Sequence, residues 1–228
     1  MIKIALSIVC FALSTTIVLG QAGQLKFKLD NTTGLTALGV TLKPATYLGK
    51  KSVQVLDTAR GITSGTKLAR LSGVTFHNGT IELEVAGRPS STAGGTARGF
   101  IGIAFRISDD NSRYECIYLR PANGRAEDQV RRNHSVQYIA HPEYPWERLR
   151  KEEPKKYETY VDLEVGVWTK VKIEVQDNTA KLYVHGAAQP TLIVSDLKLG
   201  KEATGSLGLW IGPETEGYFR NLTVTVKD

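Results

Sequence analysis

This sequence predicts an all-β fold built from many short antiparallel strands. Apolar and polar residues alternate along many segments, for example from Ile81 to Val85, and a period of two is typical of strands with one buried face. Turn-forming pairs such as Asn78-Gly79 and Asp177-Asn178 separate these segments. Many short strands with frequent turns indicate a sandwich or a barrel.

The alternation recurs in segments that each have about the length of an ordinary strand. In chain order they cover residues 81–85, 101–107, 171–175, 182–184, 207–211 and 222–226. A further strand is expected over 114–120, where Tyr114, Cys116, Tyr118 and Arg120 share one face. The sequence shows no internal repeat and no low-complexity tract.

The N-terminus has the pattern of an export signal. Residues 1–20 contain one early lysine, then an apolar run, then small residues, which predicts a secretory signal peptide. Cleavage after Gly20 or Ala22 satisfies the small-residue rule, and the alternative is an uncleaved anchor. We expect residues 21–228 to form a single domain, secreted or periplasmic, with no membrane span after signal removal.

Cysteine content and charge narrow the class of protein further. Cys10 lies in the predicted signal, which leaves Cys116 alone and excludes an internal disulfide in the mature chain. Stability must then come from burial. The formal charge of +6 is a modest excess that could favour an acidic partner, but it is weak evidence for nucleic acid, and we expect no nucleic-acid partner.

The faces opposite the predicted core differ between strands. Around 81–85 and 168–174 they are charged, which indicates a solvated sheet. Around 100–106, 114–120 and 206–212 they combine small residues with aromatic residues and arginines. The residues are Gly102, Ala104, Arg106, Tyr114, Cys116, Tyr118, Arg120, Ser206, Gly208 and Trp210. Such a face suits a ligand, because rings stack on sugar C–H groups and guanidinium forks bind oxygens. The alternative is a second, minor core.

A long segment without clear periodicity covers residues 121–157, and only 135–140 has strand character. Loops of this length are usually binding loops, lids or disordered segments. Apolar anchors such as Trp146 and Leu149 argue against disorder. The segment is basic, as is Arg120 directly before it. The basic residues are Arg120, Arg125, Arg131, Arg132, His134 and His141. A solvated charge run and a basic, aromatic lid are both consistent with this composition. Residues 147–156 could form a short surface helix.

Two stretches carry a resemblance to a known fold family. Trp168 to Val175 followed by Ala180 to Gly186, and then Gly205 to Ile211 followed by Tyr218 to Val224, resemble the closing strands of laminin-G-like and concanavalin-A-like domains. The same pattern occurs in bacterial 3-keto-disaccharide hydrolase domains. Residues 24–76 match no segment of that family. The resemblance implies a two-sheet antiparallel jelly-roll sandwich and a link to sugars, but one fold carries many activities.

Catalytic carboxylates are the first requirement for glycoside hydrolysis. The Glu-x-Asp-x-x-Glu motif of several glucanases with this fold is absent. Three carboxylate pairs at i and i+2 would share a strand face: Glu82/Glu84, Asp162/Glu164 and Glu214/Glu216. The first has a solvated pattern and the third lies in a turn. Asp162 and Glu164, together with His134, are therefore the candidate catalytic set.

Other chemistries have weaker support in the sequence. His134 and His141 are seven residues apart, with Asp128 and Glu143 nearby, but this spacing matches no standard zinc motif. We therefore expect no metal site and no cofactor. A lone cysteine such as Cys116 on a strand is typical of a small packed residue rather than a nucleophile.

These observations favour a protein that binds or accompanies a glycan or oligosaccharide, with its site on the open sheet face under the 121–157 segment. The candidate ligand-binding residues are Arg106, Tyr118, Arg120, Arg125, Arg132, His141, Trp146 and Trp210. Two alternatives stay open. One is a glycoside hydrolase acting on (3-keto-)disaccharides or other glycans, and the other is a non-catalytic envelope interaction module.

Overall fold

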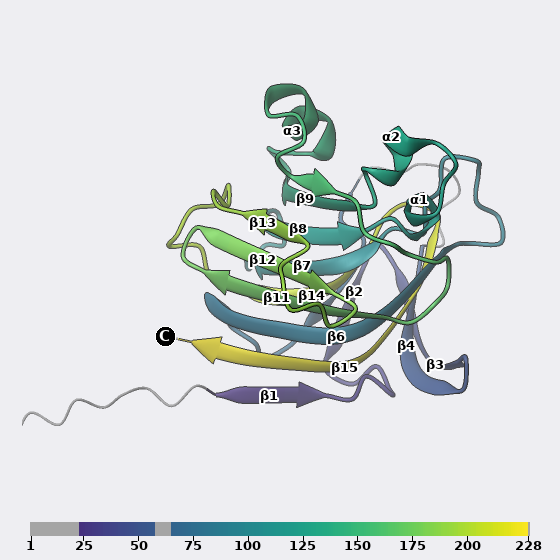
Figure 1. Ribbon diagram of the computed structural model, residues 1–228. Coiled ribbons are helices and arrows are strands. Elements are labelled where there is room, and N and C mark those ends of the chain that lie inside the picture. Colours follow the sequence, from purple (N-terminus) through teal and green to yellow (C-terminus); the bar gives the residue numbers. More distant parts are fainter. Residues whose placement is uncertain (1–22, 58–64, 228) are drawn as a thin grey trace, which may run out of the picture.

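The computed structural model describes residues 23–57 and 65–227. The predicted signal peptide and both cleavage positions lie outside the described residues. Two antiparallel sheets pack face to face (Figure 1), so the predicted two-sheet jelly-roll sandwich is confirmed. The N-terminal part, which matches no family pattern, supplies strands to both sheets.

The first sheet, called sheet A, has the strand order β13-β12-β11-β6-β15-β4-β3, with β1 also paired to β15. Its central pair is long, because β6 and β15 run together for most of their length. In chain order its strands are β1 (Gln24–Phe27), β3 (Thr41–Tyr47), β4 (Lys50–Leu56), β6 (Asn78–Pro89), β11 (Thr169–Gln176), β12 (Thr179–Val184), β13 (Leu192–Val194) and β15 (Thr215–Lys227).

The second sheet, called sheet B, has the order β10-β9-β8-β7-β14-β5-β2. It contains the segments that combine aromatic residues, arginines and small residues. In chain order its strands are β2 (Leu35–Leu38), β5 (Leu68–Leu71), β7 (Ile101–Ile107), β8 (Tyr114–Leu119), β9 (Val136–His141), β10 (Glu158–Thr159) and β14 (Ser206–Ile211).

The main core lies between the two sheets and follows the predicted alternation. Ile81, Leu83 and Val85 of β6 belong to one buried cluster with Ile101 and Ile103 of β7. Burial of large aliphatic side chains of this kind is the chief stabilising term in a chain without a disulfide. Cys116 is a free, buried thiol in the described part of the chain.

The outer face of sheet B carries a second apolar cluster. It is formed by the side chains that point away from the main core, namely Leu68, Ala104, Ile107, Tyr114, Cys116, Tyr118 and Trp210. The second core that the sequence offered as one interpretation is therefore present. It does not exclude a ligand site, because a cleft opens at the end of this cluster.

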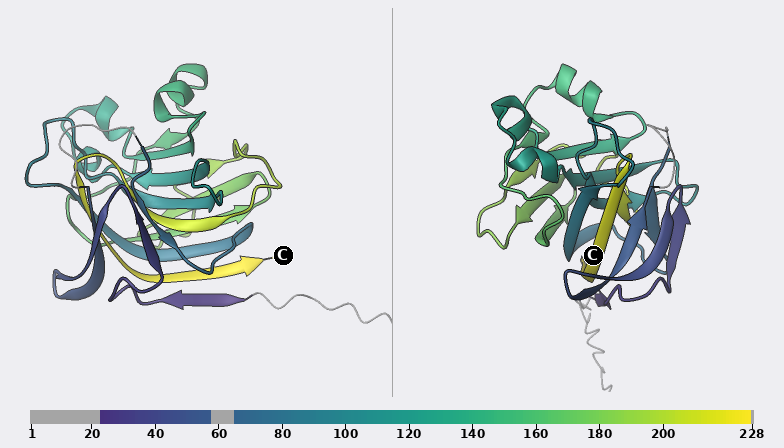
Figure 2. Two further views of the ribbon diagram at one scale, coloured as in Figure 1. Left: turned by 180° about the vertical axis from the view of Figure 1, so that it is seen from behind. Right: turned by 90° about the vertical axis from the view of Figure 1, so that its right-hand side faces the viewer.

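The segment 121–157 is more ordered than the sequence predicted. It contains α1 (Pro121–Gly124), α2 (Gln129–Arg132), the strand β9 and α3 (Trp146–Glu152), the last close to the predicted surface helix. Asp128 caps α2 by accepting a hydrogen bond from the Arg131 amide at 3.0 Å. All three helices lie on the side of the molecule opposite β1 and β15 (Figures 1 and 2).

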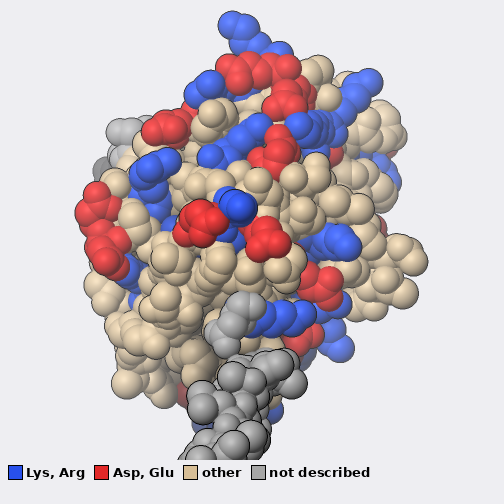
Figure 3. All heavy atoms as spheres, turned by 90° about the vertical axis from the view of Figure 1, so that its left-hand side faces the viewer, with Lys and Arg blue, Asp and Glu red and all other residues tan. Residues whose placement is uncertain are grey.

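The surface combines charges of both signs. In Figure 3 lysine, arginine and acidic side chains gather toward the top of the face, where α3 lies. Ion pairs such as Arg148–Glu152, at 2.9 Å, account for part of this mixture. None of the helices in the described part of the chain is both long and apolar enough to cross a membrane.

Candidate functional site: a cleft between the outer face of sheet B and the 121–157 segment

Two adjoining hollows, of about 320 and 260 Å³, form a cleft at the end of the second apolar cluster. They share Thr96, Phe100 and Trp146, so we describe them as the aromatic half and the basic half of one cleft. Together they reach the size range of small-molecule sites, about 300–1,000 Å³.

The floor of the aromatic half is a pair of rings on two strands separated by a third. Trp210 of β14 and Tyr118 of β8 both pair with Gly102 of β7. Because glycine has no side chain, the rings meet across it, with their centroids 4.7 Å apart. Phe100 lies edge-on to Tyr118 at 6.2 Å. The result is a rigid aromatic floor, of which Trp210 is 9 % and Tyr118 3 % exposed, and aromatic rings can stack on apolar ring faces.

One wall of the cleft comes from α3. Trp146 begins this helix and is 37 % exposed, so its ring remains available to a ligand. The guanidinium carbons of Arg150 and Arg120 lie 4.5 and 5.6 Å from the Trp146 ring centroid. These cation–π contacts hold the indole over the cleft.

Arg120 joins the two halves of the cleft. It is only 5 % exposed, and it donates hydrogen bonds to the His134 carbonyl and the Tyr118 hydroxyl, both at 3.0 Å. A longer bond of 3.4 Å reaches Oε1 of Gln137. The planar guanidinium fork therefore fixes the helix-rich segment against strand β8.

The basic half is lined by Arg98, Arg120, Arg131 and Arg150, with Asn123 and His134 between them. Burial, followed by the nearby guanidiniums of Arg131 and Arg120, lowers the pKa of Arg98. Arg131 and Arg120 are therefore close enough to Arg98 to repel it. This hollow is suited to a ligand that carries oxygens or negative charge.

His134 lies at the inner end of the basic half. Its Nδ1 is 2.9 Å from Oε2 of Glu158, which also accepts a 2.7 Å hydrogen bond from Nη2 of Arg150. Glu158 raises the pKa of His134, but burial and the guanidiniums of Arg150 and Arg120 outweigh it and lower that pKa. His134 is therefore mainly neutral at pH 7.

Two carboxylates line the aromatic half. Glu147 comes from α3, and Glu214 comes from the turn between β14 and β15. Burial raises the pKa of the Tyr118 hydroxyl to about 12, with smaller contributions in the same direction from Cys116 and Glu147. Glu214 accepts a hydrogen bond from the Gly94 amide at 3.2 Å.

Of the residues predicted from the sequence, the structure brings five together in the cleft: Tyr118, Arg120, His134, Trp146 and Trp210. Arg106 lies elsewhere. It is 1 % exposed and donates to the carbonyls of His77, Gly200 and Asp177, thereby linking sheet B to sheet A. A register irregularity in the β7–β14 pairing and a φ of +54° at Arg106 turn its side chain away from the outer face.

Asp162, Glu164 and Arg125 also lie outside the cleft. Arg125 donates to Asp162 at 2.9 and 3.0 Å and to Glu164 at 2.6 Å. All three side chains are more than half exposed. This ion-paired cluster lowers the pKa of Asp162, mainly through the hydrogen bonds from Arg125, and it occupies both carboxylates of the predicted catalytic pair.

The remaining two predicted residues, Arg132 and His141, do not line the cleft. Arg132 donates to the Tyr160 hydroxyl at 3.0 Å. His141 stacks on Tyr114, with the rings 4.7 Å apart, and burial lowers its pKa. Within the described residues, no group of three or more histidine, cysteine or acidic side chains is placed to hold a metal ion.

The structure adds cleft residues that were not selected from the sequence: Arg98, Phe100, Asn123, Arg131 and Arg150. Arg131 belongs to the basic run that the sequence showed, and Phe100 borders a predicted strand. Arg98 and Arg150 gave no such signal. They are 52 residues apart, Arg98 in the loop before β7 and Arg150 in α3, and the tertiary packing brings them into one hollow.

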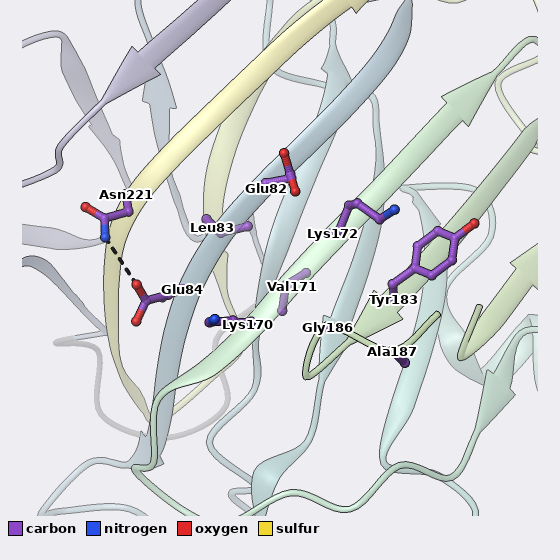
Figure 4. A pocket seen from close by; sticks show the side chains of 10 residues that line it. All are labelled: Glu82, Leu83, Glu84, Lys170, Val171, Lys172, Tyr183, Gly186, Ala187 and Asn221. Atoms are coloured by element: carbon purple, nitrogen blue, oxygen red, sulfur yellow. Dashed lines mark hydrogen bonds between the residues drawn. The ribbon is translucent and has the colours of Figure 1, made fainter. Parts of the chain in front are cut away.

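A larger hollow, of about 410 Å³, lies on the outer face of sheet A. Figure 4 shows its side chains standing on β6, β11, β12 and β15, among them Glu84, Lys172, Tyr183 and Asn221. Its polar groups bind one another: Asn221 donates to Glu84 at 3.1 Å, and Lys172 lies 4.0 Å from the Tyr183 ring centroid. This is the charged, solvated face that the sequence predicted.

The comparisons with known proteins agree on the fold. No protein-family model matches the sequence, and no curated protein does. Among solved structures, the carbohydrate-binding module CBM66 from Bacillus subtilis is similar, with a TM-score of 0.53 and 15 % identity over 83 % of this chain and 98 % of that one. A Bacillus subtilis protein of unknown function with a galectin-like fold gives 0.56 and 10 % identity, covering 90 % and 97 %.

A candidate glycosyl hydrolase from Parabacteroides distasonis gives a TM-score of 0.51 and 11 % identity, and the match covers 89 % of this chain and 94 % of that chain. At such low identity these likenesses establish the jelly-roll fold. They leave the activity to be argued from the site.

Proposed function

We propose that this chain is an exported carbohydrate-binding jelly roll and that its site is the cleft over sheet B. One observation carries the proposal: the rings of Tyr118 and Trp210 line the same hollow as Trp146, whose ring lies against the guanidiniums of Arg120 and Arg150. A sugar ring has apolar C–H faces and a hydroxyl rim, so it fits a slot with aromatic surfaces and polar ends.

The polar groups of the slot fit a sugar as well. Arg120 presents a guanidinium already fixed by three hydrogen bonds, so little side-chain entropy is lost when a ligand binds. Asn123 and His134 add hydrogen-bonding groups to the same hollow. Solved structures with this fold include a carbohydrate-binding module, which supports the proposal by analogy only.

The test is binding to a glycan array, followed by calorimetry on each hit, with the wild-type protein and Trp146→Ala. We expect saturable binding that Trp146→Ala weakens at least about tenfold, equivalent to about 1.4 kcal/mol. The matched control is Trp168→Ala, because Trp168 lies outside the cleft and donates to the Tyr47 carbonyl at 3.3 Å. Equal binding by Trp146→Ala and the wild type would refute the site.

Hydrolysis is a second candidate function, and a specific observation favours it. Glu147 and Glu214 line the aromatic half from two different elements, and glycosidases place two carboxylates beside the scissile bond. We expect Glu147→Gln and Glu214→Gln to lose turnover while retaining binding. If Asp162→Asn and Glu164→Gln abolish turnover instead, the exposed pair proposed from the sequence is the catalytic one. Absence of product from every bound glycan would exclude hydrolysis.

A further inference from the structure

The basic half of the cleft has an uncompensated positive charge. Four guanidinium groups line a hollow of about 260 Å³, and none of the described residues lining it is acidic. Within the described residues, Arg150 is the member of this set with an ion pair, to Glu158, which also lies 2.9 Å from Nδ1 of His134. Like charges gathered in a partly buried space raise the free energy of the unliganded protein.

Arg98 and Arg131 form hydrogen bonds to backbone carbonyls, which carry no net charge. Arg98 donates to the carbonyls of Gly95 and Ala97, at 2.6 and 2.9 Å. Arg131 donates to the Ala122 carbonyl at 3.2 Å. Carbonyl oxygens hold these side chains in position but do not neutralise them. Their charges therefore remain available to an anion.

Two buried polar atoms of side chains that line the hollow, besides Nδ1 of His134, which lies 2.9 Å from Oε2 of Glu158, have no hydrogen-bond partner within the described part of the chain. They are Nε of Arg131 and Oδ1 of Asn123, whose amide nitrogen already donates to the His134 carbonyl at 3.1 Å. An unpaired buried donor or acceptor is costly. The Arg131 atom requires an acceptor, such as an anionic oxygen, and the Asn123 atom requires a donor, such as a hydroxyl.

We propose that the ligand of this cleft is an acidic sugar, whose ring stacks in the aromatic half while its carboxylate or sulfate is bound by Arg98, Arg120 and Arg131. A single monosaccharide unit combines what the two halves require: a ring face, hydroxyl donors and a fixed anion. This inference rests on the proposed function, because it names the class of glycan that the same cleft selects.

The experiment compares charged sugars with their uncharged counterparts. Calorimetry is carried out with uronic-acid oligosaccharides, with their methyl esters, which remove the charge and add one methyl group, and with sulfated oligosaccharides. We expect the wild-type protein to bind at least one acidic series about tenfold or more tighter than its uncharged counterpart, with affinity that decreases as salt increases. The uronic and sulfated series distinguish the two sources of anion.

The second part of the experiment uses the variants Arg98→Gln and Arg131→Gln. These positions are chosen because neither arginine stabilises the hydrophobic core. Each variant should reduce the affinity for the acidic series about tenfold and reduce binding of the methyl ester by a clearly smaller factor. The control, Arg148→Gln, removes the same charge from an exposed site outside the cleft and should bind as the wild type does. Thermal unfolding verifies that each variant is folded.

The outcomes separate the two proposals. If methyl esters or neutral glycans bind as tightly as acids, and the arginine variants bind normally, the acidic-sugar inference is wrong but the cleft is still a glycan site. If Arg148→Gln weakens binding as much as Arg131→Gln, the effect comes from net charge and the inference is again wrong. If no glycan of either class binds, the proposed function itself fails.

Discussion

The rings of Tyr118 and Trp210 lie 4.7 Å apart although their strands are not neighbours, because the residue between them is Gly102. A Cβ at Gly102 would lie 2.6 Å from both Cα and Cβ of Tyr118 and 2.3 Å from the carbonyl oxygen of Ile117. The aromatic floor of the cleft therefore depends on the absence of one side chain in β7.

Gly102→Ala tests this dependence. The added methyl group must push β8 or the rings apart, and overpacking of this kind costs about 2 kcal/mol of unfolding free energy, measured by urea denaturation. Tryptophan fluorescence should also change as Trp210 loses contact with Tyr118. The control is Gly95→Ala, where nothing lies within 4 Å of the new atom. If both variants unfold at the wild-type urea concentration, the close packing at Gly102 is not real.

The strands could be predicted from the sequence because each buries one face, and burial leaves a period of two in residues such as Ile81, Leu83 and Val85. The same rule failed at Arg106, where an irregular register breaks the alternation and sends an arginine inward. A bulge leaves no distinct mark in the sequence, since its signal is a backbone angle. The helices of 121–157 were also only partly predicted, because α1 and α2 span four residues each.

The aromatic half of the cleft was better predicted than the basic half. Tyr118 and Trp210 lie on strands. Because successive side chains of a strand point to opposite faces of the sheet, the sequence predicts the face on which each ring lies. Arg98 lies in an irregular segment and Arg150 in the short helix α3, and the tertiary packing places them in one hollow. Exposed ion pairs such as Arg125 with Asp162 have no sequence pattern that distinguishes them from a catalytic pair.

Arg106→Leu should destabilise the protein strongly. The guanidinium satisfies the carbonyls of His77, Gly200 and Asp177 at 3.0, 3.1 and 2.8 Å, and removal of a buried, hydrogen-bonded charge typically costs about 3 kcal/mol or more. Urea denaturation measures the loss. Arg148→Leu, which removes an exposed arginine, is the control and should have a much smaller effect. A wild-type midpoint for Arg106→Leu would show that the bridge between the sheets is dispensable.

Cys116 should be inert in the folded protein. Its side chain is fully buried and its pKa is raised well above the usual value of 9.0, chiefly by burial, so little thiolate is present at pH 8. In protein carrying Cys10→Ser, a thiol reagent should react only after urea is added. Ser91→Cys, on an exposed loop, gives the reference rate. Rapid reaction of Cys116 without denaturant would contradict the packing of the outer face of sheet B.

Acidification from pH 7 toward pH 5 should lower stability through His134 and His141, whose pKa values are below the usual 6.5 in the folded state. The unfolded chain then binds more protons in this window, so protonation favours unfolding, and the stability present above pH 6.5 is lost as the pH falls. Glu115 has a raised pKa, mainly from burial, and therefore acts in the opposite direction.

The comparison of wild type with His134→Gln/His141→Gln isolates the histidines, because Glu115 is present in both proteins and its contribution cancels. Unfolding free energy is measured by urea denaturation at pH 5, 6 and 7, and we expect the wild type to lose more stability than the double variant. The carboxylates with lowered pKa, such as Asp196 at about 2, lose their contribution only below this range. Parallel pH dependence of the two proteins would show that neither histidine is held neutral by its surroundings.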